Sequence, residues 1–65
     1  MMTIERRDSL ILSFANVIAR FDKAGDVVQR DETFRDALHV ACLGRSVNAG
    51  TRALRAAVKL AKKAV

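Results

Sequence analysis

A chain of 65 residues has room for one domain, and a domain of this size buries only about 60% of the surface that its unfolded chain exposes. Hydrophobic residues make up 51% of the chain and charged residues 29%, which excludes intrinsic disorder. The single cysteine excludes an intrachain disulfide, and the net charge of +5 excludes an acidic protein. A small domain needs a further source of stability, and a disulfide within the chain cannot supply it. A partner subunit can, so we expect a homodimer.

The first predicted helix extends from about Thr3 to Lys23. The chain has no proline and only three glycines, which favours helices over a fold with many β-turns. Gly25 follows the apolar-periodic stretch and is a natural residue for the left-handed conformation that ends a helix. A tight reversal therefore follows the first helix.

A second helix is predicted from about Val27 to Leu43. Asp26 and Gln29 have the spacing of a capping box, in which each side chain bonds the backbone N–H of the other residue. Asp31 is an alternative N-cap, which would start the helix later. Gly44 is expected to end this helix in the same way that the preceding glycine ends the first.

A third helix is predicted to run to near Val65, capped by Ser46, Asn48 or Thr51. Gly50 costs about 1 kcal/mol inside a helix, which favours a start near Asn48 or later. The three segments predict an all-α fold that forms one domain over the whole chain. Its parts are a helical hairpin and a basic C-terminal helix.

The first helix has more apolar surface than one neighbour can cover. Its apolar arc spans about 220° on a helical wheel, whereas one packing partner needs about 100°. Either this helix is the central helix of a monomeric core, or one of its two apolar rows meets a second copy of the chain. The candidate dimer seam contains residues of both rows: Ile4, Leu10, Ile11, Phe14, Val17, Ile18 and Phe21.

Charge is divided unevenly along the chain. Residues 1–36 hold six basic and seven acidic side chains, whereas residues 37–65 hold six basic and no acidic ones. This asymmetry suggests an anionic partner, with a solubility tail as the alternative. The cations of the third helix share a sector of about 100°, opposite an alanine-rich face. The expected binding surface is Arg45, Asn48, Thr51, Arg52, Arg55, Lys59, Lys62 and Lys63.

Residues 38–55 distantly resemble a helix-turn-helix, the motif whose second helix enters the major groove of DNA. An apolar helix is followed by a turn at Gly44 and by a second helix with polar and basic residues near its start. Val40, Arg45 and Gly50 depart from the residues usual in this motif. The pattern favours a DNA-binding protein of the transcription-regulator type.

The sequence does not predict an enzyme. His39 and Cys42 lie three residues apart on a helix whose other members are core residues, so we interpret them as a packed sulfur and a satisfied imidazole. There is no glycine-rich phosphate loop. We expect no cofactor, no metal site and no small-molecule substrate.

The alternatives to a nucleic-acid duplex are a single strand, another protein and a membrane surface. Stacking of single-stranded bases is not expected, because Phe14, Phe21 and Phe34 all fall in core rows. The main alternative is an inhibitor or adaptor that blocks an acidic or nucleic-acid-binding surface of another protein. Membrane binding is not expected, since the third helix has no aromatic anchor. Glu5 and Asp8 lie where a signal peptide is basic, and we expect a cytoplasmic protein.

Overall fold

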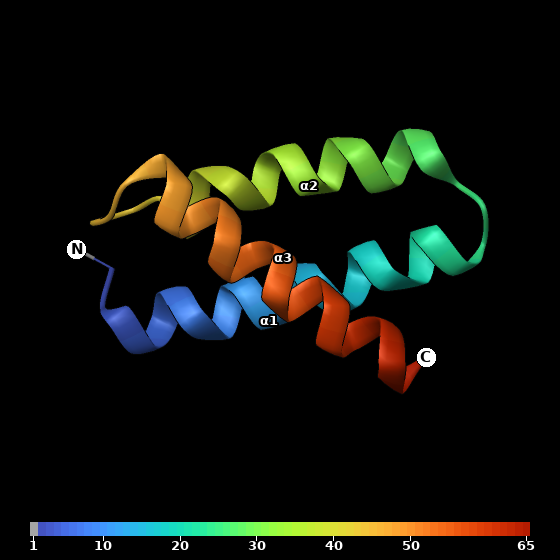
Figure 1. Ribbon diagram of the computed structural model, residues 1–65, viewed down its shortest axis with the longest axis horizontal. Helices are drawn as coiled ribbons and strands as arrows, with labels where there is room; N and C mark the ends of the chain where they lie inside the picture. Colours follow the sequence, from blue (N-terminus) through green and yellow to red (C-terminus); the bar gives the residue numbers. More distant parts are fainter. Residues whose placement is uncertain (1) are drawn as a thin grey trace.

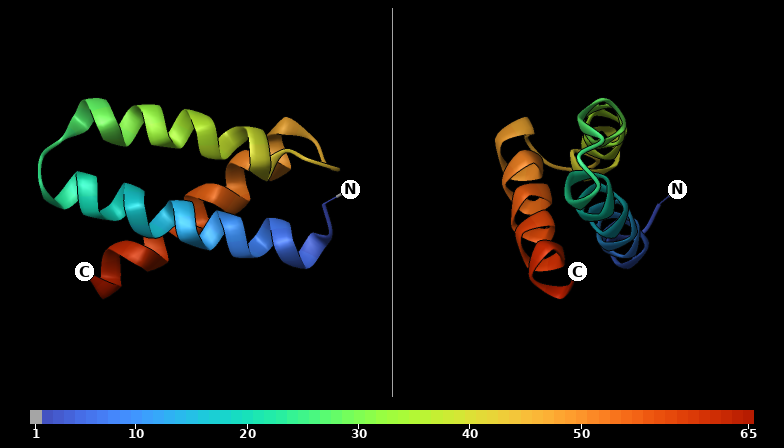
Figure 2. Two further views of the ribbon diagram at one scale, coloured as in Figure 1. Left: turned by 180° about the vertical axis from the view of Figure 1, so that it is seen from behind. Right: turned by 90° about the vertical axis from the view of Figure 1, so that its right-hand side faces the viewer.

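The computed structural model describes residues 2–65, which form three α-helices: α1 (Ile4–Lys23), α2 (Val27–Ala41) and α3 (Val47–Ala64). α1 and α2 run antiparallel in one layer, and α3 crosses one face of that layer diagonally (Figure 1, Figure 2). The described residues contain no strand. The prediction of a small three-helix, all-α fold is confirmed. None of these three helices is long and apolar enough to cross a membrane.

The turn between α1 and α2 has the predicted glycine and the predicted Asp26 cap, but the return bond of the capping box, from the Asp26 N–H to the Gln29 side chain, is replaced by a bond to Phe21. Gly25 has a φ of 76°, and the backbone N–H of Asp26 donates to the carbonyl of Phe21 at 2.9 Å, which is the bonding pattern of a Schellman motif. The Asp26 side chain then accepts from the N–H of Gln29 at 3.2 Å and caps α2. The alternative start at Asp31 is not used, because α2 already begins at the residue after Asp26.

The end of α2 comes two residues earlier than predicted. The N–H of Leu43 donates to Val40 rather than to the carbonyl four residues back, and this tighter turn ends the regular helix at Ala41. Gly44 has a φ of 73° and lets the chain turn toward α3. Ser46 caps α3, since its Oγ accepts from a backbone N–H in the first turn.

Gly50 lies buried in the first turns of α3, which begins at Val47, one residue before the predicted start near Asn48. A Cβ atom at position 50 would lie 2.6 Å from Cys42 Sγ and 2.8 Å from the carbonyl oxygen of Ala41. Tertiary packing overrides helix propensity here, because only a glycine lets the start of α3 approach the end of α2 this closely.

The core is built mainly of small side chains. Six of its ten buried hydrophobic residues are alanines, and the largest fully buried side chains are Ile18 and Leu54. Phe14, Phe34 and Leu38 pack against this cluster but are only partly buried. The helices thus approach closely around a thin core, which limits the free energy that apolar burial contributes to folding.

The two apolar rows of α1 have different environments. Ile11 and Ile18 are 4% and 2% exposed and belong to the core of a single chain, so they are not available to a second copy. The N-terminal member of that row, Ile4, is 68% exposed. In the other row Val17 is 39% exposed, and Leu10, Phe14 and Phe21 are half-buried. A seam between two copies would therefore fall on this second row.

Candidate functional site

The basic residues of α3 lie on the side of the helix that faces away from the core. The buried side of α3 is formed by Leu54, Ala57, Val58 and Ala61, which places the cations on the opposite, exposed side. A shallow groove runs along this side, and five of the eight predicted site residues line it together with Ala56: Asn48, Thr51, Arg52, Arg55 and Lys59. We call this surface the α3 groove.

The cations of this surface are not neutralised by neighbouring acids. Within residues 2–65, the ion pairs involve the basic side chains of Arg7, Arg30 and Lys62. The four exposed cations of α3 that form none of these ion pairs are Arg52, Arg55, Lys59 and Lys63. The positive potential of this face is therefore available to an anionic partner.

Lys62 differs from the other cations of α3. Its Nζ lies 3.5 Å from Asp22 Oδ2, while Asp22 Oδ1 accepts a 2.7 Å hydrogen bond from Arg30 Nη1. The hydrogen bond from Arg30, with the charge of Lys62, holds the pKa of the Asp22 carboxyl below its ordinary value. The sequence did not predict this ion pair, because Asp22 lies in the last turn of another helix, α1.

Arg45 does not join the basic surface. The side chain of Arg45 is half-buried, and its Nε donates to the carbonyl of Ala41 at the end of α2. From the other side, Arg7 Nη1 donates to the carbonyl of Leu43 at 2.8 Å. Two arginines thus bind one carbonyl in the last turn of α2 and one just after it, and they carry positive charge to the negative end of the helix dipole.

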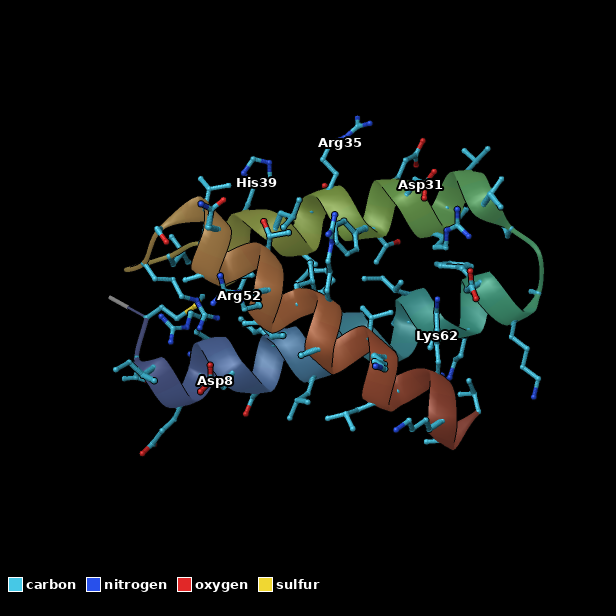
Figure 3. All side chains as sticks on the ribbon, in the orientation of Figure 1. Asp8, Asp31, Arg35, His39, Arg52 and Lys62 are labelled. Carbon is cyan, nitrogen blue, oxygen red and sulfur yellow. The ribbon has the colours of Figure 1, made fainter. Side chains whose placement is uncertain are left out.

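His39 and Cys42 are also placed differently from expectation. His39 is exposed and projects from the edge of α2 that faces away from α1, as does Arg35 (Figure 3), so it does not lie among core residues as expected. Cys42 is half-buried beside Gly50. The part of the chain that the structure describes contains no group of three or more potential metal ligands.

A second groove lies where the three helices meet, and sequence analysis did not find it. Ile18 of α1, Phe34 of α2 and Val58 of α3 supply its apolar surface. Its charged lining residues come from all three helices: Asp22, Arg30, Asp31, Arg55, Lys59 and Lys62. We call it the three-helix groove. No periodicity within one helix signals such a site, because it exists only once α3 has crossed the hairpin.

Comparisons with protein-family models, with curated proteins and with solved structures found no match for this chain.

Proposed function

We propose that this chain is a non-enzymatic nucleic-acid-binding protein that contacts phosphates through the exposed face of α3. The observation that carries the proposal is the one-sided charge of this helix: Arg52, Arg55, Lys59 and Lys63 are exposed, and none of them is among the ion pairs of the described residues. A helix that serves only the fold usually mixes charge signs, because like charges three and four residues apart repel.

The dimensions of α3 suit a nucleic-acid helix. Its 18 residues span about 27 Å, and the major groove of B-DNA is wide enough to admit an α-helix. Asn48 and Thr51 lie in the first turns beside Arg52, where a recognition helix presents side chains to base edges. We propose a DNA-binding regulator in which these residues select sequence and the later cations contact phosphates. A cytoplasmic location, expected from the sequence, gives such a protein access to its target.

The binding test uses charge reversal with a matched control. In Arg55→Glu with Lys59→Glu, affinity for a labelled DNA duplex or RNA strand should fall by at least about tenfold at about 50 mM salt. Arg20→Glu with Arg35→Glu changes the net charge equally on exposed positions of α1 and α2, and this variant should retain binding. Circular dichroism checks that both variants remain helical.

Salt dependence separates nucleic acid from the alternative partner. Wild-type affinity should fall steeply between about 50 and about 200 mM salt, because phosphate contacts release counterions. If the wild type binds neither DNA nor RNA at the lower salt concentration, the proposal fails, and an acidic protein surface becomes the partner to test. Full binding by the Arg55 and Lys59 variant would show that the charge asymmetry serves solubility only.

We also propose that the chain forms a homodimer through the partly exposed row of α1. Leu10, Phe14 and Val17 border a shallow depression, together with Ser13, and the exposed surface of this depression is apolar. Half-buried Phe21 continues the row. A thin, alanine-rich core gives one copy little apolar burial, and pairing this row with its equivalent adds to it.

Sedimentation equilibrium tests the dimer. Val17→Asp should shift the protein to the mass of one chain, because it places a charge in the seam. Leu12 is 56% exposed on another side of α1, so Leu12→Asp is the matched control and should leave the dimer intact. A wild-type protein with the mass of one chain at every concentration would contradict the proposal.

A further inference from the structure

The three-helix groove combines an apolar surface with a charged rim. Ile18, Phe34 and Val58 line it, and its volume is about 310 Å³. This volume is at the lower end of the range of about 300–1,000 Å³ that is typical of small-molecule sites. The groove therefore admits one compact group with an apolar face rather than a helix or a strand of a partner.

The charges at the rim favour an anionic group at one place. Arg30 bonds both acids of the groove, Asp22 at 2.7 Å and Asp31 at 3.1 Å, so its own charge is compensated. Lys62 lies 3.5 Å from Asp22 as well. Among the cations that line the groove, Arg55 and Lys59 form none of the ion pairs found in the described residues.

The same two cations connect the groove to the basic surface of α3. Arg55 and Lys59 line both the three-helix groove and the α3 groove. A phosphate backbone that lies along the α3 groove therefore passes the mouth of the three-helix groove. Each phosphate of a nucleic acid is joined to a sugar that carries a base. The part of the ligand closest to the mouth of the three-helix groove is therefore a sugar with its base.

Phe34 is placed to contact such a base. Its side chain is only partly buried and lines the groove, although the sequence indicated a core position for it. An aromatic ring beside a cationic track is the arrangement by which proteins bind unpaired bases. Bases inside a duplex are stacked on their neighbours and cannot enter such a groove.

We propose that the three-helix groove binds one unpaired base of a nucleic acid, with the adjacent phosphate held by Arg55 and Lys59 and the base against Phe34. This inference rests on the proposed phosphate contacts of α3 and names the ligand class. It competes with the proposal that Asn48 and Thr51 read base edges of a duplex, and the experiment below distinguishes the two. The preferred ligand is single-stranded or locally unpaired nucleic acid rather than a perfect duplex. The sequence-based expectation that excluded stacking is revised accordingly.

Three oligonucleotides of equal length test the proposal: a single strand, the same strand with abasic sites in place of its bases, and a perfect duplex. The intact single strand should bind about tenfold more tightly than the other two, since base stacking adds to the phosphate contacts. Equal binding of the intact and abasic strands, or tighter binding of the duplex, overturns the inference while the proposed function stands. If none of the three binds, both fail.

A variant of Phe34 and a control variant locate the effect. Phe34→Leu should lower the affinity for the intact strand to that for the abasic strand, and should leave the affinity for the abasic strand unchanged. Leu38→Ala is the control, because Leu38 also packs partly buried against the core but lies outside the groove and outside the proposed dimer seam. A Phe34→Leu protein that still prefers the intact strand overturns the inference.

A measurement on the wild type keeps the test independent of whether the variants fold. The methyl resonances of Ile18 and Val58 should shift when the intact strand is added, because the ring current of a base acts on nearby protons. The abasic strand, at the same degree of saturation, should leave these resonances in place. Shifts of the same size with both strands overturn the inference.

Discussion

The two ends of this three-helix bundle are held together by different interactions. At the end where α2 turns into α3, Arg7 donates to the carbonyl of Leu43 and Gly50 packs against the last turn of α2. At the other end, partly exposed side chains form ion pairs, with Asp22 between Arg30 and Lys62. The end near Gly50 is held by close packing and by a hydrogen bond to a backbone carbonyl, whereas the end near Asp22 is held by ion pairs.

This difference predicts which end of the bundle tolerates substitutions with little loss of stability. A close contact with backbone atoms cannot relax without moving a helix, whereas exposed ion pairs contribute little and are screened by salt. The start of α3, with Asn48, Thr51 and Arg52, lies at the closely packed end near Gly50. The three-helix groove reaches the ion-paired end through Asp22, Arg30 and Lys62.

The largest expected effect comes from Gly50→Ala. Helix propensity alone predicts a gain of about 1 kcal/mol, but the added Cβ overlaps the carbonyl of Ala41 and the sulfur of Cys42. Overpacking costs about 1–3 kcal/mol and occasionally more, and a clash with a backbone carbonyl places this variant at the upper end. After the gain in helix propensity we expect a net loss of about 2 kcal/mol or more in the free energy of unfolding, measured by urea denaturation. A more stable variant would contradict the close approach of α2 and α3.

A double variant separates the two contacts of Gly50. Cys42→Ala removes the sulfur, but it leaves the backbone carbonyl of Ala41 at 2.8 Å from the added Cβ. Gly50→Ala should therefore cost less in the Cys42→Ala background, and it should still destabilise the protein. Complete recovery would show that the sulfur alone forbids a side chain at this position.

The next effect in size is that of Arg7→Met. This change removes the hydrogen bond between α1 and the Leu43 carbonyl, which joins residues 36 positions apart, and it keeps most of the apolar stem. We expect a loss of about 1–2 kcal/mol in the free energy of unfolding. Arg6→Met is the matched control, because Arg6 is exposed, and it should change stability by less than about 0.5 kcal/mol.

The smallest effect is expected at the ion-paired end, in Asp22→Asn. Since the native pKa of Asp22 is below its ordinary value of 3.8, this carboxylate stabilises the wild type above that pH, and its contribution is lost as the pH falls through the native pKa. Thermal unfolding from about pH 6 to about pH 2 should show a shallower decline for the variant. Wild type and variant should converge at about 1 M salt; parallel pH curves would contradict the role of the ion pairs.

Local sequence signals predicted the helices well, because the interactions that start and end a helix lie within a few residues. Asp26 caps α2, Ser46 caps α3, and Gly25 takes the left-handed conformation that was expected. The end of α2 was misplaced, because Leu43 bonds back by three residues there and its own carbonyl accepts from the distant Arg7.

The candidate site was predicted only in part. The exposed cations of α3 follow from helical periodicity, and five of the predicted residues line one groove. Arg45 was assigned to that surface by its charge alone, whereas it bonds the carbonyl of Ala41. Lys62 was assigned to the same binding surface, and the structure places Asp22 of α1 beside it. The Lys62 contact depends on a residue of another helix, whereas the Arg45 contact is with a carbonyl four residues back, at the end of α2, which charge and helical periodicity do not reveal.

The sequence by itself therefore determined the three helices, the Asp26 cap of α2 and the one-sided charge of α3, because each depends on a helical repeat or on a few adjacent residues. It left the cap of α3 open among Ser46, Asn48 and Thr51. The tertiary structure alone decided which row of α1 is buried, why Gly50 must lack a side chain, and that a groove opens beside Phe34 and Arg55. Those features depend on where α3 crosses the hairpin, and that crossing is set by the packing of small side chains far apart in the chain.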